Sequence, residues 1–434
     1  MQDIRVSFQQ LFNNAPTLVV QSPGRINLIG EHTDYNHGFV LPAAIDKCVQ
    51  VAIAKRDDGN IKMHAIDLQE SEIITTAAIE PHVTHWVNYI IGVVAQVKKH
   101  IESANNETQI NSNLSALHPD TASVIHDLNK GFNICLQGDI PLGAGLSSSA
   151  AVECAVIFAL NEMYQLGLTT MQMALLTQQS EHEFAGVKCG IMDMFASLHG
   201  KTNQVMLLDC ANLQYSYYPL NLKEYQIVLF DTQIKHALAS SEYNTRRLEC
   251  EQGVAIMKKK FPGIQTLRDV TQQQVEACLA PTINASEKIY DSNLEANSNQ
   301  ENITQEKESI NKKVYQRCKY VVAEIDRVQL AVKDLLAGDI KAFGQKMFET
   351  HEGLSKLYEV SCPELDILVD AVKHNPHVLG ARMMGGGFGG CTINIIKKTE
   401  VEAIINMVAD VYTQKTSHIL KVYQVKIEQG THIK

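Results

Sequence analysis

The chain has 434 residues, of which 45% are hydrophobic and 20% charged, and its formal net charge is −10. This length and composition predict a globular protein of two or three domains with a large core. The negative charge argues against non-specific nucleic-acid binding, which depends on clustered Lys and Arg.

The cysteines and the hydropathy pattern argue against zinc-binding, secreted and membrane-spanning proteins. Ten cysteines occur without a Cys-x-x-Cys pair, so we read them as buried thiols in a reducing cytosol and not as zinc ligands. The first residues, MQDIRVSFQQ, lack the basic and apolar regions of a secretory signal. No segment has the roughly 18 uninterrupted apolar residues of a transmembrane helix. We expect a cytoplasmic protein that acts on small molecules, without a membrane or nucleic-acid partner.

The first elements are two strands that flank a polar motif. Residues 17–23 (TLVVQSP) form a short apolar run that ends at a proline, and residues 40–57 carry β-branched residues in near alternation up to the turn DDGN. Between them, residues 24–42 (GRINLIGEHTDYNHGFVLP) collect an arginine, a glutamate, two histidines and an aspartate. Tyr35, Asn36 and Gly38 are read as turn and support residues of this motif.

A helix and a polar stretch follow. Residues 82–101 place large apolar side chains at helical spacing and end in lysines, which suit the negative end of the helix dipole. Residues 103–130 are rich in Asn, Ser and Thr and lose this periodicity, so we expect a surface excursion and not a buried element.

Residues 138–163 (GDIPLGAGLSSSAAVECAVIFALNEM) predict a glycine turn followed by an amphipathic helix. Serines at the start of that helix would lie beside free N–H groups and the positive end of the dipole, an arrangement that binds anions without a lysine. A nucleotide phosphate is one candidate ligand, and an ordinary turn with a serine cap is the alternative. The motif is neither a Walker A loop nor a Rossmann fingerprint.

Two acids stand out in residues 178–200. Asp193 lies between Met192 and Met194, where an unpaired buried carboxylate would be costly; we expect it to be buried, in either a functional or a structural role. Glu181 lies near the end of a helix that begins around Thr169, and it is either a ligand or a solvated surface acid.

The second half begins with another polar stretch, residues 283–313, which has almost no large apolar residues and predicts an exposed insertion. Residues 314–339 and 362–375 predict helices, the second opened by a proline, and residues 390–398 predict a strand. Five glycines between residues 385 and 390 are costly in chain entropy unless the backbone passes close to a ligand or another loop.

Together, residues 24–42, PLGAGLSSSAA and GGGFGGCTINI resemble the three motifs of the GHMP family of small-molecule kinases. The first motif resembles the signature of the branch that phosphorylates galactose. Residues 189–193, 240–247 and 358–366 extend the resemblance over nearly the whole chain outside the polar stretches. It implies transfer of the γ-phosphoryl group of ATP to the C1 hydroxyl of α-D-galactose. An N-acetylgalactosamine kinase and a non-catalytic galactose sensor are the alternatives.

The resemblance also implies a fold, which is α+β with two domains and the active site in the cleft between them. The N-terminal domain, residues 1–215, would hold a mixed sheet of the kind found in the second domain of ribosomal protein S5. The C-terminal domain, residues 216–434, would be ferredoxin-like, and its glycine motif would pack against the site. We expect a monomer.

Site roles follow by the same resemblance. Asp193 would be the catalytic base, and Arg25 would stabilise charge between that base and the phosphate. Ser149 and Glu181 would hold Mg²⁺, for which a hydroxyl and a carboxylate are suitable ligands. The residues expected to bind ATP are Gly143, Ala144, Gly145, Leu146, Ser147, Ser148 and Ser149. Those expected to bind the sugar are Glu31, His32, Thr33, Asp34, Gly190 and Tyr243.

Overall fold

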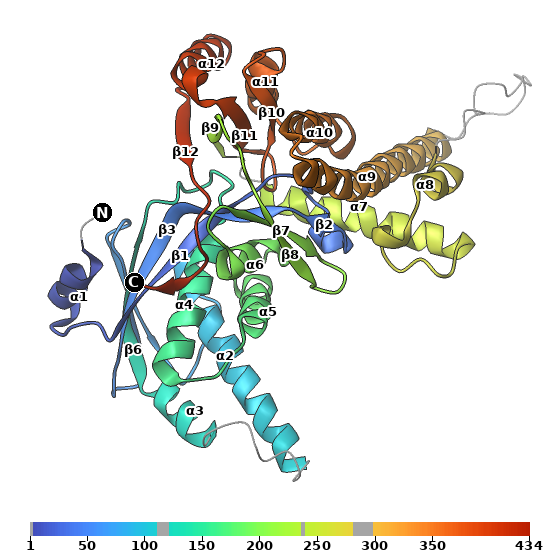
Figure 1. The fold of residues 1–434 in the computed structure, drawn as a ribbon. Helices are drawn as coiled ribbons and strands as arrows, with labels where there is room; N and C mark the ends of the chain where they lie inside the picture. Colours follow the sequence, from blue (N-terminus) through green and yellow to red (C-terminus); the bar gives the residue numbers. More distant parts are fainter. Residues whose placement is uncertain (1–2, 111–120, 236–238, 281–297) are drawn as a thin grey trace, which may run out of the picture.

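The computed structural model describes residues 3–110, 121–235, 239–280 and 298–434 (Figure 1). The strands in these ranges are β1 Leu18–Asn27, β2 Phe39–Val40, β3 Pro42–Lys55, β4 Asn60–Ala65, β5 Glu70–Thr75, β6 Gly131–Gly138, β7 Gln204–Asp209, β8 Tyr215–Pro219, β9 Tyr225–Lys235, β10 Val378–Met383, β11 Gly389–Lys397, β12 Lys421–Val425 and β13 His432–Ile433. The helices are α1 Ile4–Phe12, α2 His85–Ile110, α3 Thr121–Asn129, α4 Ser148–Tyr164, α5 Thr170–Ser180, α6 Met192–His199, α7 Ala239–Lys260, α8 Gln272–Leu279, α9 Ser298–Ala337, α10 Ile340–Gly353, α11 Pro363–Val372 and α12 Val401–Thr416. Among these helices, none combines the length and the apolar character needed to cross a bilayer.

The N-terminal half is built on a six-stranded sheet in the order β13-β1-β3-β6-β4-β5. Every pairing in this sheet is antiparallel except that between β4 and β6, so the sheet is mixed. Helices α4 and α6 pack on β1 and β3, while α2 and α5 pack on α4 (Figure 1). The predicted mixed-sheet N-terminal fold is confirmed.

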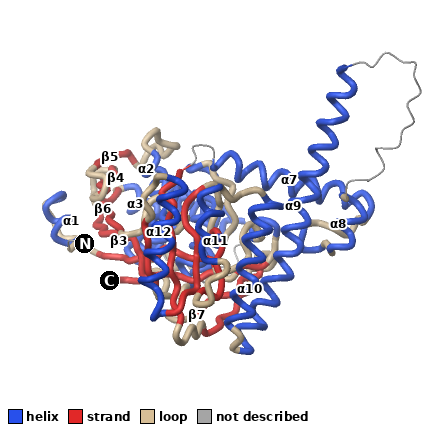
Figure 2. The backbone as a smooth tube through the Cα atoms, turned by 90° about the horizontal axis from the view of Figure 1, so that it is seen from above, coloured by secondary structure: helices blue, strands red, loops and turns tan. Residues whose placement is uncertain are grey.

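The C-terminal half has a four-stranded antiparallel sheet in the order β10-β11-β9-β12. Its elements follow the chain order β9, α11, β10, β11, α12, β12, which is the ferredoxin-like pattern. Helices α11 and α12 cover the sheet with buried Val372 and Val408. Helices α7 to α10 are inserted between β9 and α11, and α7 and α9 run side by side (Figures 1 and 2). The expected ferredoxin-like C-terminal fold is confirmed.

The two halves are also joined by the end of the chain. Strand β13 returns to the N-terminal sheet, where Ile433 pairs with Val20, and the two termini lie close together (Figures 1 and 2). A three-stranded sheet, β2-β7-β8, lies ahead of β9 in the chain. The predicted boundary near residue 215 coincides with the first residue of β8 and stays a prediction.

Most elements expected from the periodicity are present. The strands predicted at residues 17–23, 40–57 and 390–398 are β1, β3 and β11, and the helices predicted at residues 82–101, 314–339 and 362–375 are α2, α9 and α11. Pro363 occupies the first turn of α11, where no N–H partner is needed. Helix α9 ends before Gly338, whose φ of +71° is left-handed.

The first polar stretch differs in part from the expectation. Residues 103–110 continue α2 and residues 121–129 form α3, whose Leu128 is fully buried in the core. The expectation of a surface excursion without buried elements was therefore wrong at its C-terminal end. Residues 298–313 of the second stretch form the first part of α9. Residues 111–120 and 283–297 lie outside the described residues.

Candidate functional site

A charged pair from two distant segments forms the centre of the site. Arg25, on β1, donates from Nε to Asp193 Oδ1 at 2.8 Å and from Nη2 to Oδ2 at 2.9 Å. Its Nη1 donates to the backbone carbonyl of Gly145 at 2.5 Å. The Ser147 hydroxyl donates to Asp193 Oδ2 at 2.5 Å. The predicted base, the predicted cation and the predicted phosphate loop are thus in direct contact.

Burial differs between the partners of this pair. The Arg25 side chain is 5% exposed and that of Asp193 26%. Burial alone would lower the pKa of Arg25, but the charge of Asp193 and its hydrogen bonds outweigh burial and raise that pKa. The expectation that Asp193 is buried among apolar neighbours was wrong. Helix α6 buries Phe195 in the core, while Asp193, in its first turn, borders a cavity together with the buried Met192 and Met194.

The glycine turn predicted before α4 is present, but the expectation of an amphipathic helix was wrong, because α4 is buried on nearly all sides between the sheet and its neighbouring helices. Gly143 and Gly145 have φ of +79° and +75°, and Ser147, the residue before α4, also has a positive φ. The first-turn N–H groups of α4, like those of any helix, lack partners within the helix, and the Ser147 hydroxyl does not cap them because it bonds to Asp193. A helix N-terminus with free N–H groups can bind an anion such as a phosphate.

The glycine-rich loop of the C-terminal half packs on this phosphate loop. A Cβ added at Gly385 would lie 3.3 Å from the Gly145 carbonyl oxygen, and one at Gly387 would collide with the carbonyl oxygen of Val360 at 2.1 Å. Both glycines have left-handed φ. The prediction that this backbone passes close to another loop is confirmed.

Glu181 is a buried acid beside Ser149. Helix α5 begins with a capping box between Thr169 and Gln172 and ends at Ser180, so Glu181 opens the following π-turn. Burial raises the pKa of Glu181 to about 7; a hydrogen bond with Ser149 opposes the rise and the charge of Asp193 adds to it. The surface-acid alternative is excluded, because Glu181 is 6% exposed.

Most of the expected sugar residues line one cavity of about 240 Å³, together with Arg25, Asp193, Ser149 and Glu181. The sugar residues in its lining are Glu31, His32, Asp34, Gly190 and Tyr243. Burial, followed by the charge of Asp193, raises the pKa of Asp34 to about 7. Burial lowers the pKa of His32 to about 4, so this imidazole is neutral at neutral pH.

Short-range contacts hold His32 in place. Its φ is +61°, its Nδ1 is 2.8 Å from the Tyr35 hydroxyl, and Asn36 Nδ2 donates to its carbonyl oxygen at 2.9 Å. Tyr243 packs against the ring at 5.3 Å between centroids. His32 Nε2 is buried and, within the described part of the chain, has no hydrogen-bond partner. Tyr35 and Asn36 therefore act as the support residues that the sequence predicted.

Thr33 differs from the other predicted sugar residues. It is fully buried, and its hydroxyl donates to the carbonyl oxygens of Gly30 at 2.9 Å and Phe39 at 2.6 Å. It is not part of the cavity lining. We therefore correct its expected role in sugar binding: Thr33 shapes the turn that presents its neighbours.

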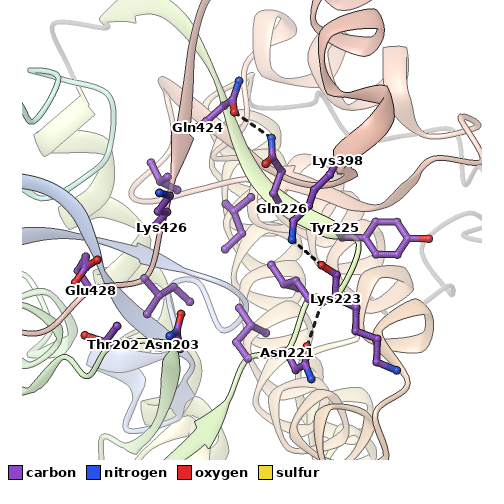
Figure 3. Close-up of a pocket in the computed structure, with 15 residues that line it drawn as sticks. Thr202, Asn203, Asn221, Lys223, Tyr225, Gln226, Lys398, Gln424, Lys426 and Glu428 are labelled. Carbon is purple, nitrogen blue, oxygen red and sulfur yellow. Dashed lines mark hydrogen bonds between the residues drawn. The ribbon is translucent and has the colours of Figure 1, made fainter.

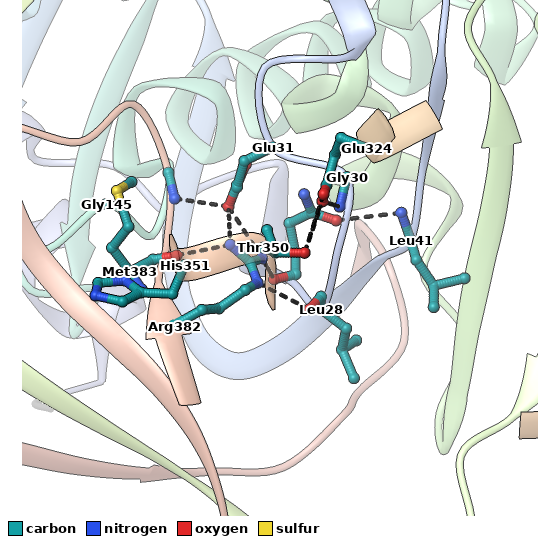
Figure 4. A network of polar contacts seen from close by, with 12 residues as sticks. Leu28, Gly30, Glu31, Leu41, Gly145, Glu324, Thr350, His351, Arg382 and Met383 are labelled. Atoms are coloured by element: carbon teal, nitrogen blue, oxygen red, sulfur yellow. Dashed lines mark hydrogen bonds and ion pairs between the residues drawn. The ribbon is translucent and has the colours of Figure 1, made fainter. Parts of the chain in front are cut away.

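Sequence reasoning missed two buried residues that touch the motif. Arg382, on β10, donates to Glu31 Oε1 from Nη1 and Nη2 at 3.1 Å each (Figure 4). Glu324, on α9, accepts from the Gly30 N–H at 2.9 Å. The available signal was weak: Arg382 is a single charge in an apolar run before the glycines, and Glu324 is one of several charged residues in its helix.

A second hollow, of about 520 Å³, lies where the end of the three-stranded sheet meets β9 and β12 (Figure 3). Its lining mixes polar and lysine side chains with apolar ones such as Leu220, Leu222 and Ile427, and Lys398 Nζ donates to the Lys223 carbonyl at 2.6 Å. None of the predicted site residues lines this hollow, so the candidate site is the smaller cavity.

Comparisons with known proteins agree with this geometry. Residues 6–55 match the family model described as the galactokinase galactose-binding signature. Residues 88–201 match the N-terminal domain of GHMP kinases, and residues 331–414 match their C-terminal domain.

Similar proteins cover nearly the whole chain. Galactokinase from Roseiflexus sp. (strain RS-1) is 34% identical over 99% of this chain and 96% of its own, and galactokinase from Thermotoga neapolitana (strain ATCC 49049) is 35% identical over 95% and 98%. The crystal structure of Lactococcus lactis galactokinase complexed with galactose matches with a TM-score of 0.82 and 29% identity, covering 99% of this chain and 98% of its own. Methanococcus jannaschii mevalonate kinase shares the fold, with a TM-score of 0.55. The chain belongs to the GHMP kinase family and, within it, to the galactokinases.

Proposed function

We propose that the chain transfers the γ-phosphoryl group of ATP to the C1 hydroxyl of α-D-galactose, which yields galactose 1-phosphate and ADP. The observation that carries this proposal is the pair of hydrogen bonds from the Arg25 guanidinium to the two carboxylate oxygens of Asp193. It borders the cavity lined by Glu31, His32 and Asp34, and it contacts the loop at the start of α4. A sugar hydroxyl in that cavity and a phosphate on that loop would therefore meet at Asp193.

Each group has a task in this reaction. Asp193 accepts or orients the proton of the attacking hydroxyl. Arg25 stabilises the charge of Asp193 and faces the phosphoryl group with a fixed positive charge. The glycine turns and the first N–H groups of α4 hold the phosphates, so that donor and acceptor are aligned for transfer. Because phosphoryl transfer involves little covalent chemistry by the protein, positioning and charge provide most of the catalysis.

The residues beside the phosphate loop fit Mg²⁺. Ser149 and Glu181 offer two oxygen ligands, and burial, with the negative charge of Asp193 added, raises the pKa of Glu181. Mg²⁺ typically takes one or two protein ligands and completes its shell with phosphates and water. We propose these two residues as its protein ligands; the bound ion would neutralise phosphate charge.

The reaction can be tested with a coupled ADP-release assay in the presence of Mg²⁺. The sugars and other acceptors to compare are galactose, N-acetylgalactosamine, glucose, mevalonate and homoserine. We expect galactose to give the highest turnover. Equal or faster turnover of N-acetylgalactosamine would show that the chain is an N-acetylgalactosamine kinase, and binding of galactose without ADP release would identify a sensor.

Gly190→Ala should raise the KM for galactose about 10-fold or more. A Cβ at this position would lie 1.9 Å from Asp34 Oδ2, so the Asp34 side chain has to turn away. The same Cβ would also lie 2.8 Å from Asp34 Cβ, which side-chain rotation cannot move, so the backbone has to shift and the thermal unfolding temperature should fall as well. Gly263→Ala is the control, because its Cβ would have no neighbour within 4 Å. An unchanged KM in Gly190→Ala would remove Asp34 from the sugar site.

The value of kcat/KM for galactose, measured with saturating Mg²⁺ and ATP, should fall as the pH drops through about 7. Asp34 has a pKa raised to about 7, so it is ionised above that pH and protonated below it. Only the ionised carboxylate can accept hydrogen bonds from sugar hydroxyls with both oxygens. His32 stays neutral, because its pKa is about 4.

The matched variant for this pH profile is Asp34→Asn, which cannot titrate. It should give a low value of kcat/KM with no inflection near pH 7. Retention of the inflection in Asp34→Asn would assign it to another group.

A further inference from the structure

A closed ring of buried contacts includes Gly30 and Glu31, which belong to the polar motif of residues 24–42 (Figure 4). On one side, Glu324 accepts from the Gly30 N–H at 2.9 Å and from the Thr350 hydroxyl at 3.0 Å. On the other side, Arg382 binds Glu31, and the N–H of Met383, its neighbour in the chain, donates to His351 Nδ1 at 3.2 Å. Since 350 and 351 are consecutive, as are 30 and 31, the ring links the motif to β10, α9 and α10.

Within this ring, the two oxygens of Glu31 are in different situations. Oε1 receives three N–H donors: Nη1 and Nη2 of Arg382, both at 3.1 Å, and the backbone N–H of Gly385 at 2.7 Å. In the described part of the chain, no protein donor bonds to Oε2. Glu31 is 2% exposed and lines the candidate cavity. One oxygen is thus committed to the protein, and the other is left for a ligand.

Arg382 is itself fixed at several points. It is fully buried, and it donates from Nε to the Leu28 carbonyl at 2.9 Å, from Nη1 to the Met383 carbonyl at 2.6 Å, and from Nη2 to the Asn27 carbonyl. The planar guanidinium therefore cannot follow a movement of the Glu31 carboxylate. Any rotation of Glu31 that takes Oε1 away would leave buried donors unpaired, which is costly.

We propose that Arg382 is a positioning residue for sugar specificity: it holds Oε1 of Glu31 so that Oε2 is presented to accept one hydroxyl of galactose. The inference rests on the proposed function, because it takes galactose as the ligand of the cavity. A buried acceptor that is held in place and loses its hydroxyl partner stays unsatisfied. The site therefore rejects sugars that lack this hydroxyl.

The first test compares wild type with Arg382→Lys on galactose and its monodeoxy analogues. Lysine keeps the charge but cannot bind Glu31 and three carbonyls together. In wild type, one deoxy sugar should have a kcat/KM at least about 10-fold below that of galactose. In Arg382→Lys, the KM for galactose should rise about 10-fold, that discrimination should shrink to about threefold, and the KM for ATP should stay unchanged.

Arg317→Lys is the matched control. Arg317 is equally buried and donates to Glu249, Glu359 and the Leu357 carbonyl, none of which lines the cavity. It should lose stability to a similar extent while keeping full discrimination among the sugars. If Arg382→Lys kept the discrimination of wild type, or raised the KM for ATP as much as that for galactose, the positioning role would be wrong.

A second variant covers the case in which Arg382→Lys does not fold. Glu31→Gln has the same shape, and the donors at Oε1 force its amide oxygen toward Arg382, so its NH₂ group faces the ligand. This group cannot accept from a hydroxyl, and the KM for galactose should rise about 10-fold or more. A KM within about threefold of wild type would contradict the proposal, because it would show that galactose binding does not need an acceptor at this position. Absence of galactose turnover in wild type would instead contradict the proposed function.

Discussion

Asp193→Ala is expected to lower kcat by about 10³-fold, within the range of about 10²–10⁴ that a positioned acid or base contributes. The carboxylate is held by two bonds from Arg25 and one from Ser147, so it is oriented before the sugar binds. Without it, the attacking hydroxyl has no acceptor for its proton, and Arg25 loses its counter-charge. The rate is measured by ADP release and ATP binding by calorimetry, and ATP binding should be retained.

Two further variants separate chemistry from folding at this position. Asp193→Asn keeps the size of the side chain and should be nearly as inactive as Asp193→Ala, because an amide is not a base. Asp139→Asn is the control, since Asp139 pairs with Lys47 Nζ and the Cys48 N–H away from the cavity. It should turn over galactose at close to the wild-type rate. Turnover above about a tenth of wild type in Asp193→Asn would contradict the role of base.

Local signals account for the elements that the sequence predicts well. Thr169 and Gln172 form the capping box that begins α5, and Pro363 opens α11. Such signals depend on a few neighbouring residues, so they can be read without the tertiary structure. Leu128 shows the limit: in a stretch dominated by polar residues, its burial is decided by the core against which α3 packs.

The site divides in the same way. Motifs identify Arg25, Asp193 and the loop, but not the contacts that hold them. Arg382 and Glu31 are 351 positions apart, and nothing in the sequence of either segment predicts that the two side chains meet. Asp193 is a similar case. Its apolar neighbours suggested burial, whereas its place in the first turn of α6 gives it one face toward the cavity. Side-chain direction depends on the fold as well as on sequence neighbours.

Arg25→Lys should lower kcat by about 10²–10³-fold, the usual cost of removing one preorganised donor at a transition state. The guanidinium holds both oxygens of Asp193 and, through Nη1, the carbonyl of Gly145. An ammonium on a flexible stem cannot hold all three. The base and the phosphate loop would lose their common link, so the fall should be in kcat more than in the KM for either substrate.

Arg56→Lys is a close control for this substitution, because Arg56 also binds an aspartate, Asp58, through Nε and Nη2, and it uses Nη1 on Asn133. This fork lies outside the cavity lining. Both variants lose a forked arginine, and only Arg25→Lys loses one that faces the reacting groups. A kcat for Arg25→Lys that matches that of Arg56→Lys would mean that Arg25 supports the fold alone. If kcat falls in Arg25→Lys but not in Arg56→Lys, phosphoryl transfer needs the planar guanidinium of Arg25 and not only its positive charge.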